Sequence, residues 1–274
     1  MSFNNYSING AEGKQIAVDF VCAEPDSKHL VVFSHGFKGF KDWGTHHLVA
    51  RYFAAQGLNF LKFNFSHNGM LDTADDSFDD LEGFANNTLT RELFDLNQVV
   101  SFALSGEKFI KPSQLCLIGH SLGGAISIIE AAENHAVNKL VTWSSICNFR
   151  TLWSSEQEEQ WLKAGVLHFE NSRTKQQMPI YSGLLKDLSE NAERLNVLSA
   201  AKKVVQPWLI IHGGEDPVVP TEQAQKLHNQ QPNAELMIIP SGDHVFCAKH
   251  PWTSEQLPDP LKQACDATIA FFKA

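Results

Sequence analysis

Short apolar runs recur along the chain, and polar or glycine-containing segments separate them. Such runs are typical of central strands in a parallel sheet, because the side chains of those strands are buried on both faces. The six runs cover residues 29–34, 58–65, 114–118, 138–143, 206–211 and 235–239. The first 25 residues have the pattern of one or two further short strands, which we expect to pair as an antiparallel hairpin at a sheet edge.

Segments with helical spacing lie between these runs. Apolar residues recur every three or four positions from Leu89 to Ala103, and the segment after residue 121 is rich in small and β-branched side chains. The predicted helices cover residues 46–56, 88–104, 122–133, 221–230 and 260–273. Strands that alternate with helices predict an α/β fold, with a mostly parallel, eight-stranded sheet and helices on both of its faces.

Residues 145–200 interrupt this alternation, because they are polar, mostly helical in character and rich in large aromatic residues. They lie between two predicted strands, so we expect them to cover the carboxyl ends of the strands as a cap. We therefore predict one domain over residues 1–274 with a cap insertion. Four cap aromatics could bind an acyl group or could form a local core: Trp153, Trp161, Phe169 and Tyr181.

The segment Gly119-His120-Ser121-Leu122-Gly123 follows an apolar strand and opens a helix of small residues. This G-x-S-x-G pattern in a strand–turn–helix context is the nucleophile elbow. The glycines leave room for the strand and helix to approach each other, and the helix N-terminus favours negative charge. We predict that Ser121 is a catalytic nucleophile; the alternative is a tight turn with a helix-capping serine.

A serine nucleophile needs a base and an orienting acid, which follow it in the chain in this fold. Residues 207–220 read PWLIIHGGEDPVVP, so Glu215 and Asp216 compete for the acid position. We assign Asp216, because Pro217 fixes the turn after it. His244 follows the last apolar run in the segment Pro240-Ser241-Gly242-Asp243, and we assign it as the base in preference to His250.

The remaining requirement is a pair of donors for the negative charge that develops on the substrate oxygen. His35-Gly36 directly follows the predicted strand at 29–34, and this turn can direct a backbone N–H into the site. We assign the oxyanion hole to the backbone N–H groups of Phe37 and Leu122. A plain strand-to-helix turn is the alternative.

Taken together, these motifs resemble the α/β-hydrolase superfamily over nearly the whole chain. The chain is most similar to small bacterial serine esterases, including the cinnamoyl/feruloyl esterase group. The segments that carry the resemblance are SHGFKGFKD at 34–42, LKFNFSHNG at 61–69, GHSLGG at 119–124, HGGEDPVVP at 212–220 and SGDHVF at 241–246. Relatives tend to have an Asp-Phe-x-Gly-His-Gly-like turn where this chain has residues 64–69, and that turn helps to shape the pocket wall.

The amino-acid composition limits the classes of binding partner that we expect. Lys and Arg number 22 and Asp and Glu number 31, which gives a formal charge of −9. This charge disfavours nucleic acid and anionic membranes, and no apolar run is long enough to span a bilayer. We expect a small-molecule ester as the partner. His46, His47 and Cys247 form no second cluster with ligand spacing, so we predict neither a metal nor any other cofactor.

The five cysteines are widely spaced without a CxxC pair, and the N-terminus lacks the features of a signal peptide. We therefore expect reduced thiols and a cytoplasmic protein. The sequence leaves the oligomeric state open.

Three functions remain after this comparison of motifs and composition. The first is hydrolysis of a carboxyl ester with a small, medium or aromatic acyl group. The second is hydrolysis of peptide, amide or thioester bonds with the same triad. An aminopeptidase would need an acidic site for the substrate amine, and the cap offers Glu156, Glu158, Glu159 and Glu170. The third is a hydrolase fold that binds a ligand without catalysis.

Overall fold

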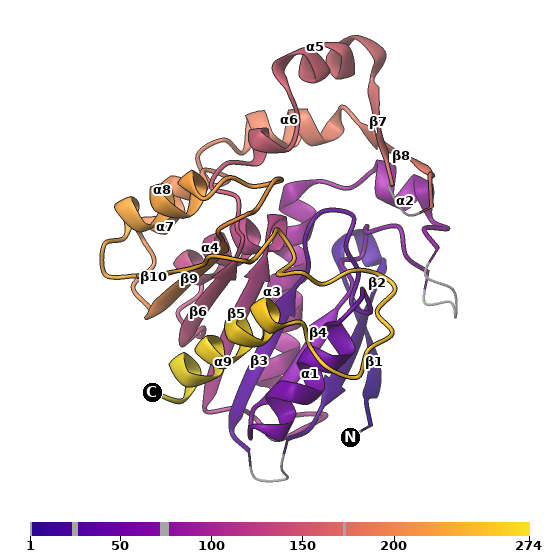
Figure 1. The fold of residues 1–274 in the computed structure, drawn as a ribbon. Helices are drawn as coiled ribbons and strands as arrows, with labels where there is room; N and C mark the ends of the chain where they lie inside the picture. Colours follow the sequence, from indigo (N-terminus) through magenta and orange to yellow (C-terminus); the bar gives the residue numbers. More distant parts are fainter. Residues whose placement is uncertain (1, 24–26, 72–76, 172–173) are drawn as a thin grey trace.

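The chain folds around one eight-stranded sheet in the order β1-β2-β4-β3-β5-β6-β9-β10, with a separate two-stranded sheet β7-β8 (Figure 1). The computed structural model describes residues 2–23, 27–71, 77–171 and 174–274. The strands are β1 Asn4–Asn9, β2 Gln15–Val21, β3 His29–Ser34, β4 Asn59–Phe63, β5 Gln114–His120, β6 Lys139–Trp143, β7 Val166–Glu170, β8 Gln177–Tyr181, β9 Trp208–Gly213 and β10 Glu235–Ile239.

The central strands are parallel, and the predicted N-terminal hairpin is present at the edge. β1 pairs antiparallel with β2, and β2 pairs antiparallel with β4. From β4 to β10 every neighbouring pair in the large sheet is parallel. The runs that predicted the central strands are buried on both faces, as the entirely buried strand β4 shows, whereas β10 at the sheet edge is partly exposed. Parallel strands place their carboxyl ends at one edge of the sheet, and the loops that follow β3, β5, β9 and β10 meet there.

Helices cover both faces of the large sheet. The helices are α1 His46–Ala55, α2 Leu81–Ala85, α3 Leu89–Ser105, α4 Leu122–Glu133, α5 Ser155–Ala164, α6 Gly183–Glu190, α7 Val197–Ala201, α8 Glu222–Gln230 and α9 Asp259–Lys273, with 3-10 turns at Ala11–Gly13 and Phe149–Leu152. Apolar residues of α1 and α9 form one core layer with the sheet, and those of α3, α4 and α8 form the other. Among the described residues, no helix is long and apolar enough to cross a membrane.

Local signals set the helix boundaries. The Thr88 side chain accepts a hydrogen bond from the Arg91 N–H at the start of α3, and Gly106 ends that helix in the left-handed region with φ 72°. At the start of α5, Ser154 and Gln157 form a reciprocal capping box. Such caps satisfy N–H groups that lack a partner within the helix.

The segment between β6 and β9 contains α5, β7, β8, α6 and α7. Figure 1 shows α5, α6, β7 and β8 together beyond one end of the large sheet, where β8 contacts α2. The insertion is mostly helical, as expected, but it also contains a hairpin, since β7 and β8 pair antiparallel from Val166↔Tyr181 to Glu170↔Gln177. The two strands have five residues each, which is too short for a period of two to stand out from a helical one.

Candidate active site

Ser121 lies on the turn between β5 and α4, with φ 55° and ψ −118°. Positive φ is strained for a residue with a β-carbon, so the surrounding structure must enforce it. The Ser121 N–H donates to the Trp143 carbonyl oxygen of neighbouring β6 at 2.9 Å, and the Ser121 carbonyl oxygen accepts from the Gly124 N–H at 3.0 Å. These bonds tie the turn both to the sheet and to the first turn of α4.

Close approach of backbone explains the glycines around Ser121. A β-carbon on Gly119 would collide with the backbone of Gly123 and Gly124. A β-carbon on Gly123 would collide with the carbonyl oxygens of Ser34 and His35, at the end of β3. The G-x-S-x-G pattern therefore brings the β5–α4 turn against the loop after β3.

The structure brings the three predicted triad residues into one chain of hydrogen bonds. The Ser121 Oγ lies 3.1 Å from His244 Nε2, and His244 Nδ1 lies 2.8 Å from Asp216 Oδ2. The loops after β5, β10 and β9 supply these side chains in that order. This is the arrangement in which a neutral imidazole can accept the serine proton while a carboxylate fixes its tautomer.

Asp216 is held in its ionised form by its surroundings. Its Oδ1 accepts from the N–H groups of Val218 and Val219, both at 2.8 Å, and the His212 ring nitrogen lies 3.4 Å from Oδ2. Burial by itself would raise the pKa of the Asp216 carboxyl, but the hydrogen bonds from His212 and His244 hold it well below its usual range. The rival acid, Glu215, is exposed.

The other histidines near the site have structural partners. His250 Nδ1 accepts from the Gly44 N–H at 2.7 Å, and its ring stacks on Trp43. His120 Nε2 donates to the His244 carbonyl oxygen at 2.8 Å. Burial and the neighbouring His244 ring lower the pKa of His120 to about 3, so it stays neutral and keeps the loop of His244 against the elbow.

The residues predicted to form the oxyanion hole, Phe37 and Leu122, lie on the two segments next to the nucleophile, the loop after β3 and the start of α4. Within the described part of the chain, neither N–H donates to a protein acceptor. Leu122 directly follows Ser121 at the start of α4, and the Gly36 backbone passes so close that a β-carbon there would lie 3.0 Å from Ser121 Cβ. Both N–H groups are thus available beside Ser121.

Buried side chains fix the loop that carries Phe37. His35 donates from Nδ1 to the Gly36 carbonyl oxygen at 3.0 Å. Asn64 Oδ1 accepts from the Lys41 N–H at 2.7 Å, and Asn68 Nδ2 donates to the Gly39 carbonyl oxygen at 3.3 Å. Asn64 and Asn68 belong to the turn after β4, and their hydrogen bonds hold the loop after β3 in place.

A buried charge cluster extends this anchoring. Lys62 of β4 is fully buried, and its Nζ contacts Asp19 Oδ2 at 2.7 Å and also Asp42. Lys41 Nζ lies 3.1 Å from Asp19 and 2.6 Å from Asp42. Burial would raise the pKa of Asp42, but the two ammonium groups hold it far below its usual range. The negative charges of the two carboxylates therefore balance the positive charges of the two ammonium groups.

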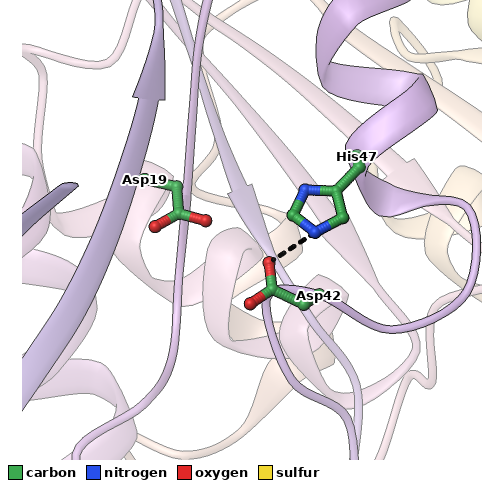
Figure 2. Close-up of side chains that lie close together, drawn as sticks. All are labelled: Asp19, Asp42 and His47. Atoms are coloured by element: carbon green, nitrogen blue, oxygen red, sulfur yellow. Dashed lines mark ion pairs between the residues drawn. The ribbon is translucent and has the colours of Figure 1, made fainter. Parts of the chain in front are cut away.

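Figure 2 shows that Asp19, Asp42 and His47 also converge, with His47 Nε2 3.3 Å from Asp42 Oδ1. Their ligand atoms lie within 4.8 Å of one another, which is a spacing that could hold a metal ion. The ammonium groups of Lys41 and Lys62 already contact both carboxylates, and a cation there would meet their repulsion. The cluster is thus better described as an ion-pair network than as a metal centre.

A cavity of about 670 Å³ opens beside Ser121 and His244. Phe37 on the loop after β3 and Phe169 of β7 both line this cavity. Their rings pack edge to face, with centroids 5.1 Å apart. The volume is in the range of small-molecule sites. Of the four cap aromatics proposed for substrate binding, only Phe169 lines this cavity.

The other three cap aromatics make structural contacts. Trp161 is fully buried, its Nε1 donates to the Ile180 carbonyl oxygen at 2.7 Å, and its ring packs edge to face on Trp153. Trp153 Nε1 donates to Glu158 at 2.7 Å, and the Tyr181 hydroxyl donates to Glu82 at 2.9 Å. Trp153 and Trp161 form the local core that was the alternative interpretation, because each indole needs a partner for its N–H when buried.

A comparison with known protein families identifies the family of this chain. The prolyl oligopeptidase family matches residues 81–257, more than half of the chain, and this range contains Ser121, Asp216 and His244. The chain belongs to the prolyl oligopeptidase family. It is also 26% identical over 147 residues to YfhR of Escherichia coli, described as an uncharacterized protein. That match covers 52% of this chain and 42% of YfhR, so the chain spans less than half the length of this relative.

Solved structures show that this member of the prolyl oligopeptidase family has the α/β-hydrolase fold, as its sequence motifs predict. It resembles an esterase domain from Rhodothermus marinus, with a TM-score of 0.68, 18% identity and coverage of 99% of this chain and 98% of that one. It also resembles Est1E from Butyrivibrio proteoclasticus in complex with ferulic acid, with a TM-score of 0.70, 18% identity and coverage of 100% and 98%.

Proposed function

We propose that this chain is a serine ester hydrolase that works through an acyl-enzyme intermediate. The observation that carries the proposal is the hydrogen-bonded chain from Ser121 Oγ through His244 to Asp216, set on a turn with φ 55° at Ser121. The strained backbone of Ser121, with its positive φ, exposes Oγ to the substrate. His244 Nε2, 3.1 Å away, can act as the base that removes the Oγ proton.

In the proposed reaction, Ser121 Oγ attacks the ester carbonyl carbon and its proton passes to His244 Nε2. The Phe37 and Leu122 N–H groups stabilise the oxyanion. The tetrahedral intermediate then expels the alcohol, which takes the proton from His244. A water molecule, deprotonated by His244, attacks the acyl-enzyme and releases the acid, and the proton returns to Ser121.

The cavity supports an ester with a small, medium or aromatic acyl group. Aromatic rings bind flat acyl groups well, and Phe37 and Phe169 both present rings to the cavity. The neighbour that binds ferulic acid, which is an aromatic acid, is a second reason to place aromatic acyl esters in the substrate screen. The buried thiols of Cys116, Cys147 and Cys265 fit the proposed cytoplasmic location.

Peptide hydrolysis is the second candidate, because the chain belongs to a family described by its oligopeptidases. An aminopeptidase needs a carboxylate for the substrate amine, and the described residues of the cavity wall include neither Asp nor Glu. Of the cap carboxylates considered for this role, Glu158 bonds to Trp153 and Glu170 pairs with Lys175. We therefore favour ester hydrolysis.

Labelling with a fluorophosphonate probe tests the proposal, with the Ser121→Ala variant as the control. We expect labelling of the wild-type protein at Ser121 and none in the variant. A screen of p-nitrophenyl, hydroxycinnamoyl, thioester and aminoacyl-amide substrates then separates the bond types. Absence of labelling in the folded wild-type protein would contradict catalysis and favour a non-catalytic ligand-binding role. Labelling with turnover of amides alone would favour the peptidase.

A further inference from the structure

The cavity wall has a charge that differs from that of the whole chain. The protein carries a formal charge of −9, yet the charged side chains among the described wall residues are two lysines, Lys38 and Lys249. A concave site of one sign in a low-dielectric surrounding attracts ligands of the opposite sign. The wall is thus suited to an anionic group, whereas the net charge of the whole chain is negative.

Lys38 has a fixed place in this wall. It directly follows Phe37, whose N–H is a proposed oxyanion donor, and it has a positive φ of 56°. Its Nζ donates to the Glu170 carbonyl oxygen at 3.0 Å and lies 5.7 Å from the centroid of the Phe37 ring. The ammonium group is therefore held between the loop after β3 and the end of β7, and Lys38 lines the same cavity as Ser121.

The Lys38 charge is only partly compensated. Burial lowers the pKa of Lys38, and the nearby Glu170 carboxylate acts in the opposite direction. That carboxylate also lies 3.1 Å from Lys175, so Lys38 shares it with a second cation. An ammonium group has three N–H donors, and the Glu170 carbonyl oxygen takes one of them. Two donors remain for a ligand.

We propose that the site selects esters that carry a carboxylate in addition to the scissile ester, and that Lys38 binds this carboxylate. The inference rests on the proposed ester hydrolysis and adds the chemical class of the substrate. A charge-assisted hydrogen bond in a partly buried site strengthens binding by about 1.5–3 kcal/mol, which corresponds to about 10- to 150-fold in affinity.

The bond to Glu170 offers a competing role for Lys38, which is to hold the cap in place. A tether would affect every substrate that touches the cap, whether neutral or anionic. An ammonium group that stabilises the oxyanion would likewise affect neutral and anionic esters alike. A carboxylate-binding role affects the anionic ester alone, so a pair of matched substrates separates it from both.

The experiment compares kcat/KM for two matched pairs, each corrected for its rate of hydrolysis by hydroxide. Monoethyl adipate against ethyl heptanoate places the carboxylate on the acyl side, and 4-acetoxybenzoate against p-tolyl acetate places it on the alcohol side. The variants are Lys38→Met, which keeps most of the length of the side chain and removes the charge, Lys38→Arg, which keeps the charge, and Lys249→Met, which removes the charge of the other lysine.

We expect the wild-type enzyme to prefer the anionic ester by about 10-fold or more in at least one pair, which identifies the side that bears the carboxylate. Lys38→Met should abolish this preference and change the neutral ester by less than about 3-fold, since the neutral ester makes no charge-assisted bond. Lys38→Arg should retain most of the preference, and added salt should weaken it.

Three outcomes would overturn the inference: no preference in either pair, equal losses on neutral and anionic esters in Lys38→Met, or an equal loss of preference in Lys249→Met. Ester hydrolysis itself is measured separately, as the turnover of p-tolyl acetate by the wild-type protein and the loss of this turnover in Ser121→Ala. An active enzyme without a preference for the anionic esters refutes only the inference about the carboxylate. An inactive enzyme refutes the proposed function.

Discussion

The carboxyl edge of the sheet and the cap both contribute residues to the cavity wall, and they are held in different ways. At the sheet edge, buried side chains such as Asn64 and His35 bond directly to the backbone of the loop after β3. The cap instead is held by apolar packing around Trp161, which belongs to the same core cluster as α3 and α4, and by bonds such as Gln176 Nε2 to the Phe78 carbonyl oxygen at 2.8 Å.

This contrast suggests a division of roles. At the sheet edge, buried hydrogen bonds hold the loop after β3 and the triad side chains in place, and stabilisation of a transition state needs such fixed positions. The cap contributes the Phe169 ring to the cavity, whereas Trp153 and Trp161 pack against each other away from it. We therefore expect changes at the sheet edge to lower kcat, and changes in the cap to act on KM and on the choice of substrate.

The largest effect is expected at the acid. Asp216→Asn should lower kcat by about 10⁴, because the amide favours the wrong imidazole tautomer of His244. Glu215→Gln is the matched control, since that neighbouring carboxylate is exposed, and it should retain nearly full activity. Steady-state kinetics on p-nitrophenyl acetate measure both. The opposite ranking of the two variants would move the acid to Glu215.

Removal of a proposed oxyanion donor comes next. Leu122→Pro deletes the N–H at the start of α4, where proline is tolerated, and should lower kcat by about 10² to 10³. Leu122→Ala keeps the N–H and should have a much smaller effect on kcat. Circular dichroism checks that both variants fold. If Leu122→Ala were as inactive as Ser121→Ala, the donor would not be the backbone group.

Acid should weaken the sheet edge through its buried histidines. Burial lowers the pKa of His35 to about 4, whereas an unfolded histidine titrates near 6.5, so the unfolded chain takes up a proton that the folded chain refuses. Stability is therefore lost as the pH falls from 6.5 toward 4, and His35 alone accounts for about 3 kcal/mol at the lower pH.

Urea denaturation over this pH range tests the prediction. His35→Gln should be less stable at neutral pH but should lose less stability on acidification. The cap residue His168 is exposed, so His168→Gln should follow the wild-type slope. A wild-type slope in His35→Gln would show that other groups govern the acid response.

Loss of a bond that holds the loop after β3 should lower kcat moderately. Asn64→Ala removes the acceptor of the Lys41 N–H, and a small shift of the loop then misplaces the Phe37 N–H. We expect kcat to fall by about 10-fold with KM little changed. Asn64→Asp keeps the acceptor oxygen and should recover most of the activity. Equal losses in both variants would show that the amide group itself, and not its acceptor oxygen, is required.

The smallest effect is expected from the cap. Phe169→Ala should raise KM for hydroxycinnamoyl esters by about 10-fold through loss of ring contact, and should leave p-nitrophenyl acetate nearly unchanged. Tyr181→Phe is the control, because Tyr181 contacts Glu82 and does not line the cavity. Similar losses on both esters in Phe169→Ala would mean that this residue only supports the cap.

The sequence predicts the large sheet well, because its central strands are buried on both faces and therefore appear as unbroken apolar runs. The structure has β10 at Glu235–Ile239 and α4 at Leu122–Glu133, the same residues that the pattern indicates. The elbow, acid and histidine motifs each follow a strand, so a parallel sheet must bring them to one edge. Their proximity could be predicted, and their catalytic roles remain predictions.

Other features lie beyond what pattern can predict. Lys62 is fully buried inside β4, and nothing in the run LNFLKFNF shows that Asp19 and Asp42 approach it from other segments. An asparagine after a strand, such as Asn64, looks like any turn residue until its partner is known. In the cap, the number of aromatics suggested a binding surface, but the need of Trp153 and Trp161 for a core and for N–H partners placed them inside it.

The cap joins two strands that are immediate neighbours, since Leu140 of β6 pairs with Trp208 of β9. The large sheet can therefore close its hydrogen bonds across β6 and β9 whether or not α5, β7 and β8 have docked. The cap should then unfold and refold as a cooperative unit of lower stability than the sheet. Its backbone amides would exchange with deuterated water sooner than those of β3, β5 and β6, even while the triad side chains stay in register.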